Sequence, residues 1–109
     1  MALDLTGAVL TFSDEFNSFS WNSNGQSSIT PNLTKNGIWT THYWWGGGDR
    51  SLPGNGEQGY YADPETAIVQ RYPWTNPFSV RDGVLTIKAQ PSPDASLSGG
   101  LPYVSGMIT

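Results

Sequence analysis

Indole rings and an amide-bearing turn are the side chains with the most evident chemistry in this sequence. Trp44 and Trp45 precede a run of three glycines, and Arg50 follows that run closely. The stretch "PGNGEQGYY" places Asn55 and Glu57 at a turn beside two tyrosines. Aromatic faces flanked by a few placed polar groups suit sugars, because ring faces take the C–H side of a pyranose and polar groups bond its hydroxyls. We therefore expect these residues to contact a hydroxyl-rich ligand.

Trp74 adds a further candidate, in the stretch "RYPWTNP", where two prolines stiffen the loop. Structural roles compete with each of these assignments. A Trp in a β-rich fold is more often core than ligand platform, and adjacent Trp44 and Trp45 on a strand would point to opposite faces. We expect Trp39 to pack inside. Glu57 is equally consistent with a carboxylate that accepts turn amides.

A catalytic pair of carboxylates is not evident. Glycoside hydrolysis by retention or inversion places two carboxyl groups about 5–5.5 Å or about 6.5–9.5 Å apart. Asp14 and Glu15 are adjacent and diverge on an extended segment. Asp63 and Glu65 flank Pro64 and are predicted to form a surface corner. His42 is predicted to lie on a strand face without a catalytic role.

Composition narrows the function classes. The 109 residues carry a net charge of −4 with only five Lys and Arg, which argues against a nucleic-acid footprint. There is no Cys and one His, which excludes disulfides, thiolate chemistry and multi-histidine metal sites. Charged residues make up only 13%, against about a quarter in an average domain, so a neutral partner is favoured. We expect no membrane span and see no signal peptide at the start.

Several segments are predicted to be strands. The Asp82-Gly83 pair is a preferred type I′ hairpin turn, and it pairs Phe78 with Ile87 and Val80 with Leu85 on one apolar face. Further strands are expected at residues 8–16, 37–45, 67–71 and 103–109, with a long polar loop between them at residues 17–36. No helix is predicted. These elements favour an all-β fold, an antiparallel β-sandwich, and one that continues beyond the last predicted strand.

Four stretches in order, "FSDEF", "GNGEQGYY", "NPFSVRDGVLTIKA" and "YVSGMIT", resemble the N-terminal portion of glycoside hydrolase family 16. This family includes laminarinases, lichenases and related endo-acting β-glucanases and exopolysaccharide depolymerases. The resemblance implies a concanavalin A-like jelly-roll with a substrate cleft, of which residues 1–109 form the N-terminal part of a single domain. It also implies retaining hydrolysis by two Glu of a Glu-x-Asp-x-x-Glu strand. That pattern does not occur in this sequence, so the chain alone is expected to be inactive.

The resemblance assigns further residues. Asn55 matches a sugar-contacting position with Glu57 close by, and Gly106 and Ile108 would lie on a cleft-lining strand. No cofactor is required, but a structural calcium is implied, with the backbone carbonyls of Glu15 and Gly83 among its ligands. The implied partner is a polysaccharide or oligosaccharide, a β-glucan or related exopolysaccharide, and this substrate class implies a secreted, extracellular protein.

Two other functions stay open at this point. The first is a non-catalytic carbohydrate-binding module of similar β-sandwich form, which would bind oligosaccharide without cleaving it. The second is a structural or adhesive β-domain with no affinity for sugars.

Overall fold

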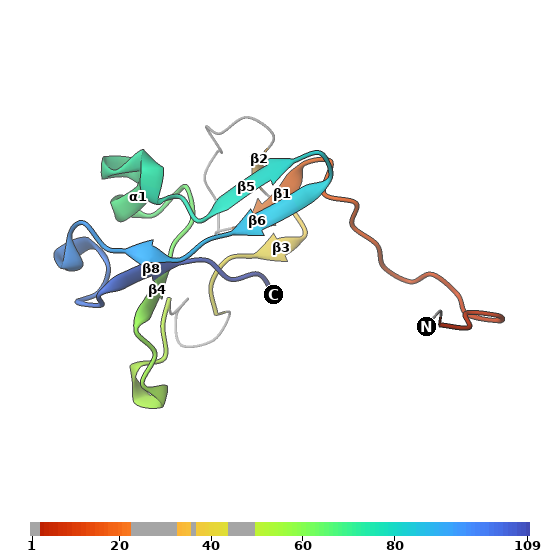
Figure 1. Cartoon of the computed structure of the whole chain (residues 1–109), viewed down its shortest axis with the longest axis horizontal. Helices are drawn as coiled ribbons and strands as arrows, with labels where there is room; N and C mark the ends of the chain where they lie inside the picture. The colour runs from red at the N-terminus through yellow and green to blue at the C-terminus, as the bar shows by residue number, and fades with distance from the viewer. Residues whose placement is uncertain (1–2, 23–32, 36, 44–49) are drawn as a thin grey trace.

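The structure is a computed structural model that describes residues 3–22, 33–35, 37–43 and 50–109 (Figure 1). Short strands dominate this part of the chain, joined by one α-helix and three 3-10 turns. The strands are β1 (Phe19–Asn22), β2 (Leu33–Lys35), β3 (Trp39–Thr40), β4 (Gly59–Tyr61), β5 (Phe78–Arg81), β6 (Val84–Ile87), β7 (Gln90–Pro91) and β8 (Tyr103–Ser105). The helix is α1 (Ala67–Arg71), and the turns are η1 (Pro53–Asn55), η2 (Pro73–Thr75) and η3 (Ala95–Leu97). The prediction of a β-rich fold is confirmed.

The hairpin β5–β6 has the predicted register. Phe78 pairs with Ile87 and Val80 with Leu85, in antiparallel orientation. The turn between the strands has φ of 52° at Asp82 and 75° at Gly83, the positive values that a type I′ turn requires. The hairpin is local, so its pairing follows from the turn and the period-2 pattern alone.

The other two sheets differ from the expectation of antiparallel pairing. Strand β1 pairs in parallel with both β2 and β3, and β4 pairs in parallel with β8, whereas β8 and β7 are antiparallel. Parallel neighbours need a long connection, and the chain between β4 and β8 contains α1 and the hairpin. The described residues thus form three small sheets. The jelly-roll sandwich stays a prediction.

Two hydrophobic clusters form the core. The first consists of Phe19, Trp21 and Phe78, with Val80 and Leu85 of the hairpin packed against it. The Phe19 and Phe78 rings lie 4.7 Å apart between centroids. The second consists of Ala62, Ile68, Val69 and Val104, and it joins α1 to the sheet β4-β8-β7.

The predicted strand at residues 8–16 is wrong. This segment has no strand pairing, extends away from the body, and leaves Val9 82% exposed (Figure 1). A strand needs a neighbour for its backbone groups, and the apolar composition of the segment does not supply one. The segment is attached at Trp39, whose Nε1 donates to Asp14 Oδ2 at 2.6 Å and whose ring stacks on Phe16.

The predicted strand at residues 67–71 is also wrong, because this stretch is the helix α1. The Gln70 N–H donates to the Thr66 carbonyl, and the Tyr72 N–H donates to the Ile68 carbonyl. Ile68 and Val69 are strand-forming residue types, but both face the second cluster from the helix. Helical hydrogen bonds and burial override the local propensity. Within the part of the chain that is described, no helix has the length and apolar character of a membrane span.

The two remaining predicted strands are shorter than expected. In the segment 37–45, only Trp39–Thr40 is a strand, and residues 44–49 lie outside the described part. His42 follows this strand and is buried. In the segment 103–109 the strand ends at Ser105, and Thr109 instead exchanges two backbone hydrogen bonds of 3.0 Å with Thr40.

Gly83→Ala tests the hairpin turn. We expect this change to lower the free energy of unfolding by roughly 1–2 kcal/mol, because a Cβ is strained at this positive φ. Gly54→Ala is the matched control, since its Cβ would meet open space, and urea unfolding should show a change below about 0.5 kcal/mol. Equal stability of the two variants would contradict the type I′ assignment.

Candidate functional site

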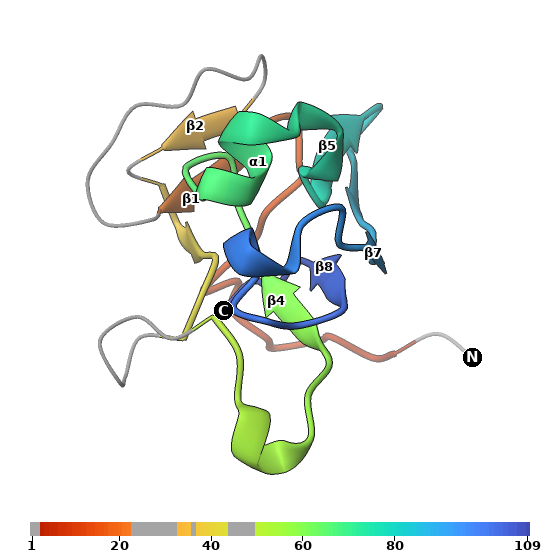
Figure 2. The same cartoon turned by 90° about the vertical axis from the view of Figure 1, so that its left-hand side faces the viewer.

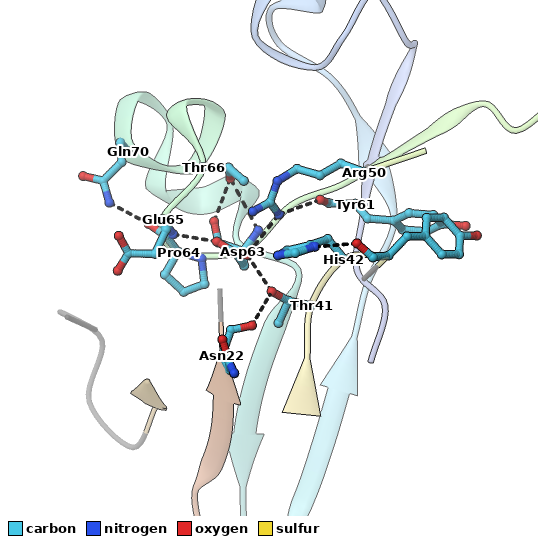
Figure 3. Close-up of polar contacts among 11 residues, drawn as sticks. Asn22, Thr41, His42, Arg50, Tyr61, Asp63, Pro64, Glu65, Thr66 and Gln70 are labelled. Carbon is cyan, nitrogen blue, oxygen red and sulfur yellow. Dashed lines mark hydrogen bonds and ion pairs between the residues drawn. The ribbon is translucent and has the colours of Figure 1, made fainter. Parts of the chain in front are cut away.

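The Asp63 carboxylate is the centre of a buried polar network (Figure 3). Its Oδ2 accepts a hydrogen bond from Thr41 Oγ1 at 2.6 Å and forms an ion pair with Arg50 Nη1 at 2.9 Å. Its Oδ1 accepts the Glu65 N–H at 2.8 Å, at the start of the turn that leads into α1. Asp63 is fully buried, so these partners replace the water that an ionised carboxylate would otherwise need.

Arg50 closes the base of a loop. The Tyr61 N–H donates to the Arg50 carbonyl at 2.8 Å, and Arg50 Nη1 donates back to the Tyr61 carbonyl at 3.1 Å. The same guanidinium pairs with Asp63. The network therefore fixes the two ends of residues 50–61, the segment that carries Asn55 and Glu57.

Glu57 organises the interior of this loop. Its Oε2 accepts the Leu52 N–H at 2.9 Å, and its Oε1 accepts the Tyr43 hydroxyl at 3.1 Å. The alternative interpretation, that Glu57 accepts a turn amide, is confirmed. Asn55 ends η1, donates its own N–H to the Leu52 carbonyl, and is exposed. The loop thus presents Asn55 to solvent and uses Glu57 to hold its shape.

Asp63 is the residue that sequence reasoning placed wrongly. It was predicted to lie at a surface corner with Glu65, yet its side chain is fully buried. Arg50 was predicted to contact substrate, and the structure places its guanidinium in the pair with Asp63, with 18% of the side chain exposed. Asp-Pro-Glu-Thr before apolar residues is a sequence signal for the start of the helix, but nothing local indicates the pairing of Asp63 with Arg50.

Gly106 and Ile108 lie against the core. A Cβ on Gly106 would come within 2.9 Å of the Pro77 Cβ and the Ile87 Cγ2, so this side of the glycine is filled. Ile108 packs against the first cluster. These contacts favour packing roles, and sugar contacts at both positions stay predictions. Trp39 also packs against this cluster, as expected.

Of the remaining predicted site residues, Trp74 lies in the described part of the chain. Trp44 and Trp45 lie outside the described residues. Trp74 is on η2, and Figures 1 and 2 show that its neighbour α1 and the loop containing η1 lie at opposite ends of the body. The described residues enclose no pocket, so the cleft expected beside Asn55 is not seen in that part of the chain.

The Glu15 carbonyl lies near the Gly83 backbone. The Glu15 carbonyl oxygen is 3.4 Å from the position that a Cβ on Gly83 would occupy. Calcium takes about six to eight oxygens, and the described residues contain no group of three or more acidic, His or Cys side chains that could complete the shell. The calcium site stays a prediction.

Comparison with known proteins finds relatives that are named glycanases. The chain is 39% identical over 112 residues to the endo-1,3-1,4-beta-glycanase EglC of Rhizobium meliloti (strain 1021), and 39% identical over 115 residues to the endo-1,3-1,4-beta-glycanase ExsH of the same strain. Both alignments cover 100% of this chain. The chain is similar to endo-β-glycanases along its whole length. It spans only 21% of the length of each relative. No family model matches the chain, and no solved structure matches it.

Asp63→Ala tests the network. We expect it to lower the free energy of unfolding by roughly 3 kcal/mol or more, because it removes one partner of a buried ion pair. Thr41→Val should cost about 1 kcal/mol, the value of one hydrogen bond. Chemical denaturation measures both, with Arg81→Ala as control, since the Arg81–Asp82 pair is over 90% exposed. Asp63→Ala with the stability of Arg81→Ala would contradict the network's role.

The hydrogen bond between Tyr43 and Glu57 predicts a pH dependence. Burial raises the pKa of Tyr43 from 10.0 to about 12, and the bond to Glu57 acts in the same direction. Because the neutral phenol is favoured in the folded state, its stabilising contribution is complete below pH 10 and is lost as the pH rises through about 12. Tyr43→Phe should therefore flatten the fall in stability above pH 10, as measured by urea unfolding across that range. Parallel profiles for the two proteins would contradict this coupling.

Proposed function

We propose that this chain is part of a retaining, endo-acting glycoside hydrolase of β-1,3/β-1,3-1,4-glucan or a related exopolysaccharide. The observation that carries the proposal is its 39% identity, over its whole length, to two proteins named endo-1,3-1,4-beta-glycanases. The low charge and the aromatic content are consistent with a neutral, hydroxyl-rich polymer. Membership of glycoside hydrolase family 16, the jelly-roll fold and an extracellular location belong to the same proposal.

The role proposed for this chain is substrate contact. In a double displacement, a carboxylate nucleophile forms a glycosyl-enzyme and a second carboxyl group acts as acid and then base. We assign both groups to residues outside this sequence. The exposed Asn55, on a loop whose ends are fixed by Arg50, would hydrogen-bond sugar hydroxyls at a distance from the bond that is cleaved. Such remote contacts add binding energy that positions the polymer for cleavage.

The calcium ion is proposed as a structural group only. If bound, it would supply charge that holds the Glu15 and Gly83 segments together, without a part in catalysis. The alternative function, a non-catalytic carbohydrate-binding module, would bind glucan without cleaving it.

The intact protein in which this chain occurs should release oligosaccharides from mixed-linkage β-1,3-1,4-glucan. Reducing-end assays measure the rate, and NMR of the first products should show the β-anomer. Asn55→Ala should lower kcat/KM by roughly three- to tenfold, the loss of about one hydrogen bond. Ser79→Ala, exposed on the hairpin, should leave it unchanged.

Two results would contradict the proposal. Glucan binding without any new reducing ends would favour the carbohydrate-binding module. Neither binding nor cleavage of any β-glucan would favour a structural domain. Initial products of α configuration would contradict the retaining mechanism but not glucan hydrolysis.

A further inference from the structure

An exposed indole lies outside the loop that carries Asn55. Trp74 is the central residue of η2, between α1 and β5, and its side chain is 55% exposed. Trp21, by contrast, is fully buried in the first cluster. The exposed part of the Trp74 indole is therefore available to stack on a ligand.

The backbone beneath Trp74 is firmly held. Pro73 is the first residue of η2 and fixes its φ. Thr75 is fully buried, and its hydroxyl donates to the Tyr72 carbonyl at 2.6 Å. On the other side, Gln90 Nε2 donates to the Trp74 carbonyl at 3.3 Å and ties η2 to β7. An indole on such a turn loses little conformational freedom when a ligand binds it.

The neighbours of Trp74 add both aromatic and charged groups to the surface around the indole. The Tyr72 ring meets the indole edge-on, with centroids 6.3 Å apart and planes at 67°. The Arg71 guanidinium lies 5.7 Å from the centroid of the Tyr72 ring. An apolar ring face therefore lies beside a phenol and a multi-donor cation. This combination suits a pyranose, which has an apolar C–H face and equatorial hydroxyls.

The position of η2 separates it from the candidate loop. In Figures 1 and 2, α1 lies at the top of the molecule and the loop containing η1 at the bottom, with β4 and β8 between them. The second cluster packs Tyr72 against the residues of α1, so η2 stays at the α1 end. The turn η2, which carries Trp74, and the loop that carries Asn55 therefore lie on different parts of the molecule.

We propose that Trp74, flanked by Tyr72 and Arg71, is a second glycan contact that stacks on pyranose rings of a neutral β-linked glucan. The polymer's identity rests on the proposed function. An extended chain suits this position, because the indole is exposed at the surface of the described residues. A neutral chain is favoured because the net charge of −4 disfavours an anionic polymer.

Affinity electrophoresis of the intact protein tests this contact. Migration is compared in the cold through gels with and without mixed-linkage β-glucan. Trp74→Ala should weaken retardation roughly tenfold in apparent Kd, the loss typical of a well-held aromatic contact. Trp74→Phe should keep part of it. Tyr103→Ala is the matched control, because Tyr103 is an aromatic side chain of similar exposure, 46%, on β8, and it should behave as wild type.

Activity on a short substrate distinguishes a contact at Trp74 from one at the loop that carries Asn55. Trp74→Ala should leave kcat/KM on a short soluble oligosaccharide unchanged, since such a substrate does not extend to η2. Thermal unfolding checks the variant, and where it is destabilised, Trp74→Gln gives the same comparison with a non-aromatic side chain of similar reach.

The outcomes distinguish the two proposals. Glucan cleavage with undiminished gel retardation of Trp74→Ala would overturn this inference alone. A parallel loss of activity on polymer and short oligosaccharide would place Trp74 at the cleavage site and also overturn it. An intact protein that neither binds nor cleaves glucan would overturn the proposed function together with this contact.

Discussion

A single buried charge ties this molecule together. The Asp63 carboxylate has no exposed surface, and an ionised group without water must be matched by donors or it destabilises the fold by several kcal/mol. The donors come from three parts of the chain: the Thr41 hydroxyl after β3, the Arg50 guanidinium at the loop base, and the Glu65 amide before α1. The segments that supply them are thereby held in one arrangement.

This polar link matters because the hydrophobic clusters are small and separate. The first depends on β1 and the hairpin, and the second on α1 and β8. The C-terminal stretch connects them directly, since Val104 belongs to the second cluster and Ile108 packs against the first. Gly106 lies between these residues, where a larger side chain would meet Pro77 and Phe78. A glycine is therefore needed where the chain passes from one cluster to the other.

The element that the sequence predicts best is one that is specified by residues close together in the chain. The hairpin was predicted down to its residue pairs, because an Asp-Gly turn and an alternating pattern specify it within ten residues. Residues 8–16 have the composition of a strand but no neighbour to pair with, and residues 67–71 become helical through contacts that propensity does not contain. Asp63 was misplaced for the same reason, since its ion pair is with Arg50, a residue of a separate segment. Trp74 stays a predicted ligand contact: its residue is exposed, but its place on η2, next to α1, depends on tertiary structure (Figure 1).

The separation of Trp74 from Asn55 has a consequence for how a polymer would be held. If both proposed contacts hold, a long glucan stacked on Trp74 would stay tethered while other sugar units approach the loop, and such a tether would raise the effective concentration at the second site. This increase in effective concentration requires a fixed distance between the two sites. The clamp at Arg50 and Asp63 fixes the loop, and the buried Thr75 fixes η2. The same arrangement gives no advantage to an oligosaccharide too short to reach both positions. The proposed arrangement would therefore favour a long polymer, which can reach both positions, over a short oligosaccharide, which cannot.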